Sequence, residues 1–179
     1  MPGMDDSAPL VLTLALEAEA QAWLQALRDA HVPPERNLVP AHVTLFHHLP
    51  RAELAAIAAN LAVECAARPA PPVRLGPPRF LGRGVALAVV APEVAALRGR
   101  FAALWAAWLT PQDRQGWRPH ATVQNKVAPA AARALHAELA ASLPVREARA
   151  EALRLWRYRG GPWEAAGRFG FGSGAPSRL

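Results

Sequence analysis

The 179-residue chain has one cysteine, Cys65, and one lysine, and it has no apolar run near the roughly 20 residues that cross a membrane. A single cysteine excludes an internal disulfide framework and a zinc site made of several cysteines. The first residues include Asp5 and Asp6 and lack a basic segment followed by an apolar one, so no secretory signal is indicated. We therefore expect a cytoplasmic monomer that does not associate with membranes.

Basic charge is carried almost entirely by arginine, since Lys126 is the only lysine among 20 basic residues. The formal net charge is +6 and the sequence pI is near 11.1, which suits an anionic partner such as nucleic acid or phosphate. The arginines are spread along the chain rather than gathered in one segment. The charge therefore indicates a class of partner without locating a binding site.

The chain reads as two similar halves, at about residues 10–81 and 84–158, in which apolar runs typical of strands alternate with alanine-rich segments typical of helices. The pattern predicts strands at 10–16, 41–49, 73–81, 85–90, 120–127 and 145–158, and helices at 17–30, 51–67, 92–109 and 128–143. We expect an internally duplicated α+β protein that forms a single domain over residues 1–179. The glycine-rich tail, residues 160–179, is expected to be irregular.

The middle strand of each half carries the same short motif. The two copies, His42-Val43-Thr44-Leu45 and His120-Ala121-Thr122-Val123, begin 78 residues apart. Side chains alternate between the two faces of a strand, so a histidine and a threonine two positions apart point the same way. Each motif therefore presents one imidazole and one hydroxyl on a polar face, and two apolar side chains toward a core.

The residue types in these motifs suit acid–base chemistry on a phosphate. An imidazole titrates near neutral pH, so one histidine can accept a proton while a second donates one. Threonine hydroxyls donate hydrogen bonds to phosphate oxygens without adding charge. Such a site could activate water and protonate a leaving ribose oxygen with no metal or cofactor. A single His-x-Thr triplet is more simply an ordinary strand segment, but two copies in equivalent strands favour the catalytic interpretation.

With these motifs the sequence resembles the two-histidine phosphoesterases, the superfamily that includes bacterial RNA 2′,3′-cyclic phosphodiesterases, also called 2′-5′ RNA ligases. The resemblance covers about residues 10–158, and Pro119, directly before the second motif, also fits the family pattern. It implies a two-lobed α+β fold with antiparallel sheets, helices outside and an active cleft between the lobes. It also implies an enzyme that opens cyclic phosphates on RNA ends or on nucleotides, with 2′-5′ ligation as the reverse reaction.

Carried over by motif position, the resemblance makes His42 and His120 the catalytic pair and Thr44 and Thr122 the phosphate-binding residues. It further implies that the first histidine is the proton donor and the second the acceptor. No metal or cofactor is implied. A catalytically inert RNA-binding module of the same fold is the alternative from a different functional class, although binding alone does not need two titratable groups.

The residues after the motifs depart from the family pattern. Family members that act on RNA ends often have an arginine a few residues after each motif. Here the first motif is followed by Phe46, His47 and His48, and the second by Gln124, Asn125 and Lys126. This difference leaves another small cyclic phosphodiester open as the substrate.

Strand alternation would extend both polar faces beyond the motifs. It adds Phe46 and His48 beside the first motif, and Arg118, Gln124 and Lys126 beside the second. Arg118 or Lys126 could contact substrate phosphate or ribose, and Phe46 could stack on a base. Tyr158, near the end of the last strand, could also line the cleft. The alternatives are solvated charges at strand ends and aromatic side chains packed in the core.

Three histidines close together in the sequence, His42, His47 and His48, raise the alternative of a metal site. A catalytic metal needs about three converging protein ligands. His47 and His48 are neighbours on a predicted strand, so they would face opposite sides unless a bulge intervenes. We therefore expect no metal site.

Overall fold

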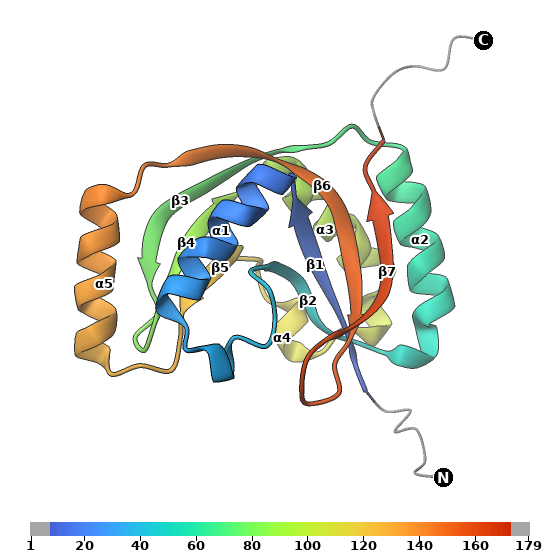
Figure 1. Cartoon of the computed structure of the whole chain (residues 1–179). Coiled ribbons are helices and arrows are strands. Elements are labelled where there is room, and N and C mark those ends of the chain that lie inside the picture. Colours follow the sequence, from blue (N-terminus) through green and yellow to red (C-terminus); the bar gives the residue numbers. More distant parts are fainter. Residues whose placement is uncertain (1–7, 173–179) are drawn as a thin grey trace.

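The computed structural model describes residues 8–172, in which seven strands form one antiparallel sheet. The strands run in the order β1-β2-β5-β4-β3-β6-β7, and β1 also pairs with β6. Six strands therefore close into a ring, and β7 extends it from β6 (Figure 1). Their bounds are β1 Leu10–Leu16, β2 Val43–Leu49, β3 Pro72–Phe80, β4 Val85–Val90, β5 His120–Gln124, β6 Arg146–Arg157 and β7 Glu164–Gly170.

Helices surround this sheet (Figure 1). They are α1 Ala18–His31, α2 Leu54–Ala66, α3 Pro92–Leu104, the single-turn α4 Pro111–Arg114 and α5 Pro129–Ser142, with short 3₁₀ turns at Pro34–Arg36, Arg51–Glu53 and Ala106–Trp108. The expected α+β fold with antiparallel strands and outer helices is confirmed. Across residues 8–172, none of these helices has the length and apolar character needed to cross a membrane.

The two halves of the chain exchange their third strands. The order β1-α1-β2-α2-β3 recurs as β4-α3-β5-α5-β6, with α4 added before β5. In space, β1 and β2 of the first half are joined by β6 of the second, while β4 and β5 of the second half are joined by β3 of the first. Each lobe is therefore completed by a strand from the other half of the sequence.

The core lies on the face of the sheet to which alternate leucines of β1 point. Leu10, Leu12, Leu14 and Leu16 are all buried, as the period of two in a strand requires. Aromatic side chains from α3 and the residue after it fill the adjoining space, where Phe101 stacks on Trp105 with ring centroids 4.6 Å apart. The opposite face of β2 and β5 carries Thr44, His120 and Thr122, which are only partly buried.

Part of the C-terminal tail is regular rather than irregular as expected. Residues 164–170 form β7, which is paired with β6. At one end of the pairing Gly170 lies opposite Ala152, and at the other Glu164 lies opposite Arg157. Phe169 packs against the core. Glycines that indicate a loop in isolation are tolerated here because β6 offers a paired edge. Residues 173–179 lie outside the described residues. The bounds differ by three residues or more at three further elements: the helix expected at 92–109 ends at Leu104, the strand expected at 120–127 ends at Gln124, and the helix expected at 51–67 begins at Leu54.

Candidate active site

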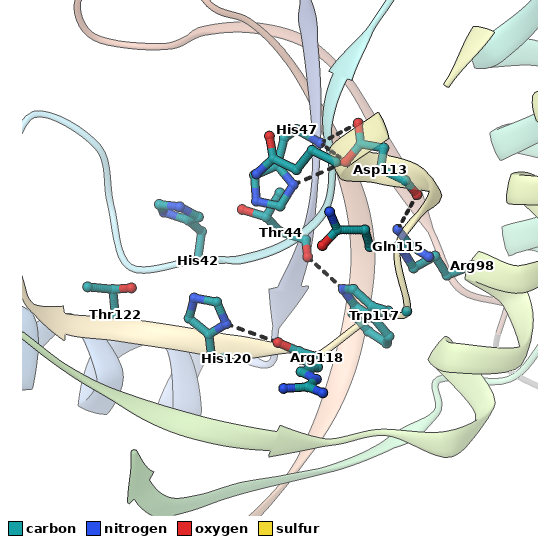
Figure 2. A pocket seen from close by; sticks show the side chains of 12 residues that line it. His42, Thr44, His47, Arg98, Asp113, Gln115, Trp117, Arg118, His120 and Thr122 are labelled. Atoms are coloured by element: carbon teal, nitrogen blue, oxygen red, sulfur yellow. Dashed lines mark hydrogen bonds and ion pairs between the residues drawn. The ribbon is translucent and has the colours of Figure 1, made fainter. Parts of the chain in front are cut away.

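The two motifs lie side by side where β2 meets β5. Val43 pairs with Ala121, and both are fully buried. This pair sets an antiparallel register in which His42 lies opposite Thr122 and Thr44 lies opposite His120. Residues opposite one another share a face, so all four side chains project from one side of the sheet, with the two histidines on a diagonal. Figure 2 shows the four around a common opening.

Both imidazoles are held in the same way. The Nδ1 atom of His42 lies 2.7 Å from the carbonyl oxygen of Pro40, and the Nδ1 atom of His120 lies 3.0 Å from that of Arg118. A carbonyl oxygen can only accept, so each ring carries its proton on Nδ1 when neutral. Nε2 of each ring is therefore the atom left to exchange protons with a substrate.

Each motif strand is held by a buried arginine from a helix of the other half. Arg28 of α1 donates to the carbonyl oxygen of Thr122 at 2.9 Å, and Arg98 of α3 donates to that of Leu45 at 2.8 Å. The indole of Trp117 donates to the carbonyl oxygen of Thr44 at 2.8 Å. These contacts fix the backbone of both motifs relative to each other, which acid–base catalysis requires.

A cavity of about 500 Å³ opens in front of the four side chains. Its wall is formed by the segment from Gln112 to Arg118, which includes the end of α4, and by His47. A smaller adjoining cavity of about 300 Å³ is lined by the same two histidines and two threonines together with His47, Tyr158 and Trp163. The site thus lies between the strand set β1-β2-β6 and the strand set β3-β4-β5.

The family model of the 2′-5′ RNA ligase superfamily matches residues 16–162. This range includes both motifs and five strands of the ring in full, but only the last residue of β1, Leu16. The chain belongs to the 2′-5′ RNA ligase superfamily. None of the curated proteins matches the chain.

Solved structures share the fold of this superfamily member. TT0787 of Thermus thermophilus superposes with a TM-score of 0.66 at 21% identity, over 93% of this chain and 100% of the other. LigT of E. coli in complex with 3′-AMP gives 0.61 at 18% identity, over 92% and 98%. A protein described as a phosphoesterase gives 0.57 at 20% identity, over 92% and 99%. At these identities the likeness establishes the fold alone.

The prediction that Phe46 faces the cleft is wrong, because a bulge follows the first motif. The pairs with β1 run from Thr13–Thr44 to Leu12–Phe46, which leaves Leu45 as an extra residue on β2. Leu45 and Phe46 are consequently both buried. The ring of Phe46 packs edge-on against Trp105, with the centroids 5.4 Å apart, and cannot stack on a substrate base.

A second bulge follows the second motif in the equivalent place. The pairs with β4 run from Ala86–Thr122 to Val85–Gln124, so that Val123 is the extra residue on β5. Gln124, expected on the polar face, is buried. The strand then ends, and Lys126 adopts a left-handed backbone conformation (φ 58°) in a separate cavity of about 220 Å³. Lys126 is therefore displaced from the opening between the histidines, whereas Arg118 does line the main cavity.

The structure brings one further pair into the site that sequence reasoning missed. The bulge at Leu45 turns His47 toward the cavity in place of Phe46. Its Nδ1 lies 3.1 Å from Oδ1 of Asp113, whose side chain is completely buried (Figure 2). The same carboxylate accepts the backbone N–H groups of His47 and His48 at 2.9–3.0 Å. The two histidines after the motif are visible in the sequence. Asp113, the partner of His47, is 66 positions further along the chain, so the sequence pattern does not connect the two residues.

Hydrogen-bond donors keep Asp113 ionised despite its burial. Burial acts to raise its pKa, but the hydrogen bonds from the His47 ring and from the His47 and His48 amides outweigh it, and the pKa lies below its ordinary value.

No group of three or more His, Cys, Asp or Glu side chains within residues 8–172 is arranged to hold a metal ion. His47 therefore lines the cavity as one partner of a His–Asp pair.

His42 is neutral in the free protein over most of the pH range. Burial lowers its pKa from 6.5 to about 4; the hydrogen bond to Pro40 opposes this, and the positive charges of Arg28, His120 and His47 add to it. A neutral ring can accept a proton at Nε2. An anionic phosphate bound beside it would favour the imidazolium form, since opposite charges stabilise each other.

We expect His42 to make folding stability depend on pH between about 4 and 6.5. In that window the unfolded chain binds more protons at this position than the folded protein, so stability falls as the pH falls from 6.5 toward 4. His42→Gln removes this contribution. Urea unfolding of both proteins at pH 7 and pH 4.5 measures it, and the wild-type protein should lose more stability than the variant. Equal losses would show that His42 has an ordinary pKa.

Proposed function

We propose that the protein is a metal-independent phosphoesterase that opens 2′,3′-cyclic phosphates, on RNA ends or nucleotides, to phosphomonoesters. The observation that carries this proposal is the square of two imidazoles and two hydroxyls formed across the Val43–Ala121 pair. The rings are oriented by carbonyl groups so that both Nε2 atoms are available. Binding alone would not need two such titratable groups.

The four side chains supply every group that the hydrolysis needs. The hydroxyls of Thr44 and Thr122 donate hydrogen bonds to the two non-bridging oxygens of the phosphate. Nε2 of one histidine takes a proton from water, whose oxygen forms a bond to phosphorus. Nε2 of the other histidine gives a proton to the ribose oxygen as its bond to phosphorus breaks. The orientation of the ribose decides which histidine donates. With a ribose hydroxyl of another strand in place of water, the same proton transfers join that hydroxyl to phosphorus as the bond to the leaving ribose oxygen breaks.

The structural neighbours are consistent with this chemistry. LigT of E. coli has been crystallised with 3′-AMP and with phosphate, and another neighbour is described as a phosphoesterase. A nucleoside 3′-phosphate is one of the two products that opening a 2′,3′-cyclic phosphate can give. The net charge of +6 also suits a phosphate-bearing substrate.

The test is incubation of the purified protein with a nucleoside 2′,3′-cyclic phosphate in the presence of EDTA. We expect conversion to a nucleoside phosphomonoester at the same rate with and without the chelator. Chromatography or ³¹P NMR measures this rate. The position of the product phosphate, 2′ or 3′, identifies the bond that breaks. Binding without turnover would support the inert RNA-binding module instead, and turnover that EDTA abolishes would exclude the metal-independent mechanism.

A further inference from the structure

His47 is a third imidazole beside the two motifs, and the two-histidine mechanism does not use it. Its side chain lines both the cavity of about 500 Å³ and the smaller cavity of about 300 Å³ over the motif residues. It follows Thr44 on the polar face of β2, because the bulge at Leu45 shifts the alternation by one residue. His47 therefore lies where a bound substrate would react, although it belongs to neither motif.

The ring of His47 is oriented by a buried carboxylate. Its Nδ1 lies 3.1 Å from Oδ1 of Asp113 (Figure 2). That carboxylate is fixed in turn, since it also accepts the backbone N–H groups of His47 and His48. The backbone of Asp113 is held by Arg98, a buried side chain that donates to its carbonyl oxygen at 2.9 Å. The direction of the His47 ring is therefore set by the fold before any substrate binds.

This contact decides which nitrogen of His47 is available in the cavity. An ionised carboxylate can only accept hydrogen bonds, so the neutral ring carries its proton on Nδ1 and can accept a hydrogen bond at Nε2. His42 and His120 are held in the same tautomer by backbone carbonyl groups. The three rings thus supply three Nε2 acceptors, one more than the two-histidine hydrolysis uses.

The reacting groups in that hydrolysis leave one hydrogen-bond donor without a partner. Thr44 and Thr122 hold the two non-bridging oxygens, and one of the two catalytic histidines protonates the departing ribose oxygen. The other histidine takes one of the two protons of the attacking water. The second O–H of that water has no partner in this scheme. Both ribose oxygens of a cyclic phosphate are bonded to phosphorus, so neither of them supplies a competing hydroxyl.

We propose that His47 is a further catalytic residue, whose Nε2 accepts a hydrogen bond from the second O–H of the attacking water and so aims the water oxygen at phosphorus. His42 and His120 keep both proton transfers, and the second proton stays on the oxygen that has joined phosphorus. This inference rests on the proposed function and adds a preference for the nucleophile. Water, with two O–H bonds, is favoured over an alcohol, which has only one.

Competition between water and methanol tests this preference. The substrate is a nucleoside 2′,3′-cyclic phosphate in a fixed mixture of the two. The oxygen of either molecule bonds to phosphorus, and its proton passes to the base histidine. The bond from phosphorus to the ribose oxygen breaks, and that oxygen takes a proton from the other histidine. Water gives the nucleoside phosphomonoester and methanol gives its methyl ester, so chromatography of the initial products measures the ratio of the two.

His47→Phe keeps a flat ring but removes the acceptor. It should lower kcat/KM for hydrolysis by about fivefold or more, the effect of losing one hydrogen bond, and raise the ratio of methyl ester to monoester by a similar factor. Both products come from the same folded molecules, so the ratio does not depend on how much of the protein is folded. The matched control is His48→Phe, the same substitution at an exposed neighbour outside the catalytic cavity, which should keep the wild-type ratio.

An unchanged ratio in His47→Phe would overturn the inference. With unchanged rates, His47 would take no part in the reaction; with equal losses of both products, it would bind the phosphate and not the water. In either case the proposed function would stand. Formation of neither product by the wild-type protein would overturn the proposed function and this inference together.

Discussion

His120→Ala and His42→Ala should each lower kcat/KM on a 2′,3′-cyclic phosphate by about 10²–10⁴-fold, the usual contribution of one general acid or base. Each variant removes one of the two Nε2 atoms that the proposed mechanism uses, and no other described side chain takes its place beside the two threonines. The double variant should lose much less than the product of the two single losses, because the two rings act in one step. Initial rates at saturating and subsaturating substrate measure both kcat and KM.

His48→Ala is the matched control for these variants. His48 is exposed on β2, the strand that begins directly after His42, and it does not line the catalytic cavity. The activity of His48→Ala should equal that of the wild-type protein. Circular dichroism and thermal unfolding must show that all the variants are folded. Near wild-type turnover in either His42→Ala or His120→Ala would falsify the two-histidine mechanism.

Asp113→Ala should lower the free energy of unfolding by about 3–5 kcal/mol, a large fraction of the stability of a domain. The carboxylate is completely buried and accepts hydrogen bonds from the backbone N–H groups of His47 and His48 and from the His47 ring. Alanine leaves these donors without an acceptor beneath the surface. Because the folded pKa of Asp113 is lowered, its contribution is present at neutral pH and disappears as the pH falls through and below the ordinary carboxylate range.

Two further variants separate the parts of this effect. Asp113→Asn keeps one carbonyl oxygen as an acceptor and should destabilise the protein less than Asp113→Ala. His47→Ala removes only the half-exposed ring contact, which contributes little to stability. Guanidinium unfolding at neutral pH measures all three. A loss below about 1 kcal/mol in Asp113→Ala would mean that water satisfies the freed amides, and the carboxylate would not be the group that holds this wall of the site.

The candidate catalytic residues could be predicted because they depend on a local rule. Alternation along a strand places His42 with Thr44, and His120 with Thr122, whatever the rest of the fold does. The strands at 10–16 and 85–90 were likewise predicted within their observed bounds, because their apolar runs are long and uninterrupted.

The residues around the motifs could not be predicted from the same rule. One extra residue directly after each motif threonine, Leu45 and Val123, reverses the alternation there and buries Phe46 and Gln124. The bulge depends on the neighbouring strands, which the sequence pattern does not identify. Asp113 reaches the site through a single helical turn, α4, in a segment between the predicted helix at 92–109 and the predicted strand at 120–127. Trp163 reaches it because residues 164–170 form an additional strand.

The closed ring also governs how the polypeptide acquires its structure during synthesis. β1 is synthesised before the other described strands, yet it pairs along its whole length with β6. Leu10, for example, can pair only after Arg157 has been synthesised. The ring cannot close until the ribosome has released the chain through β6. Contacts between such distant segments make folding slow and leave the leucine-rich β1 exposed in the nascent chain. The yield of folded protein on expression should therefore depend on chaperone supply and temperature. This dependence should be stronger than that of a protein of the same size built from local contacts.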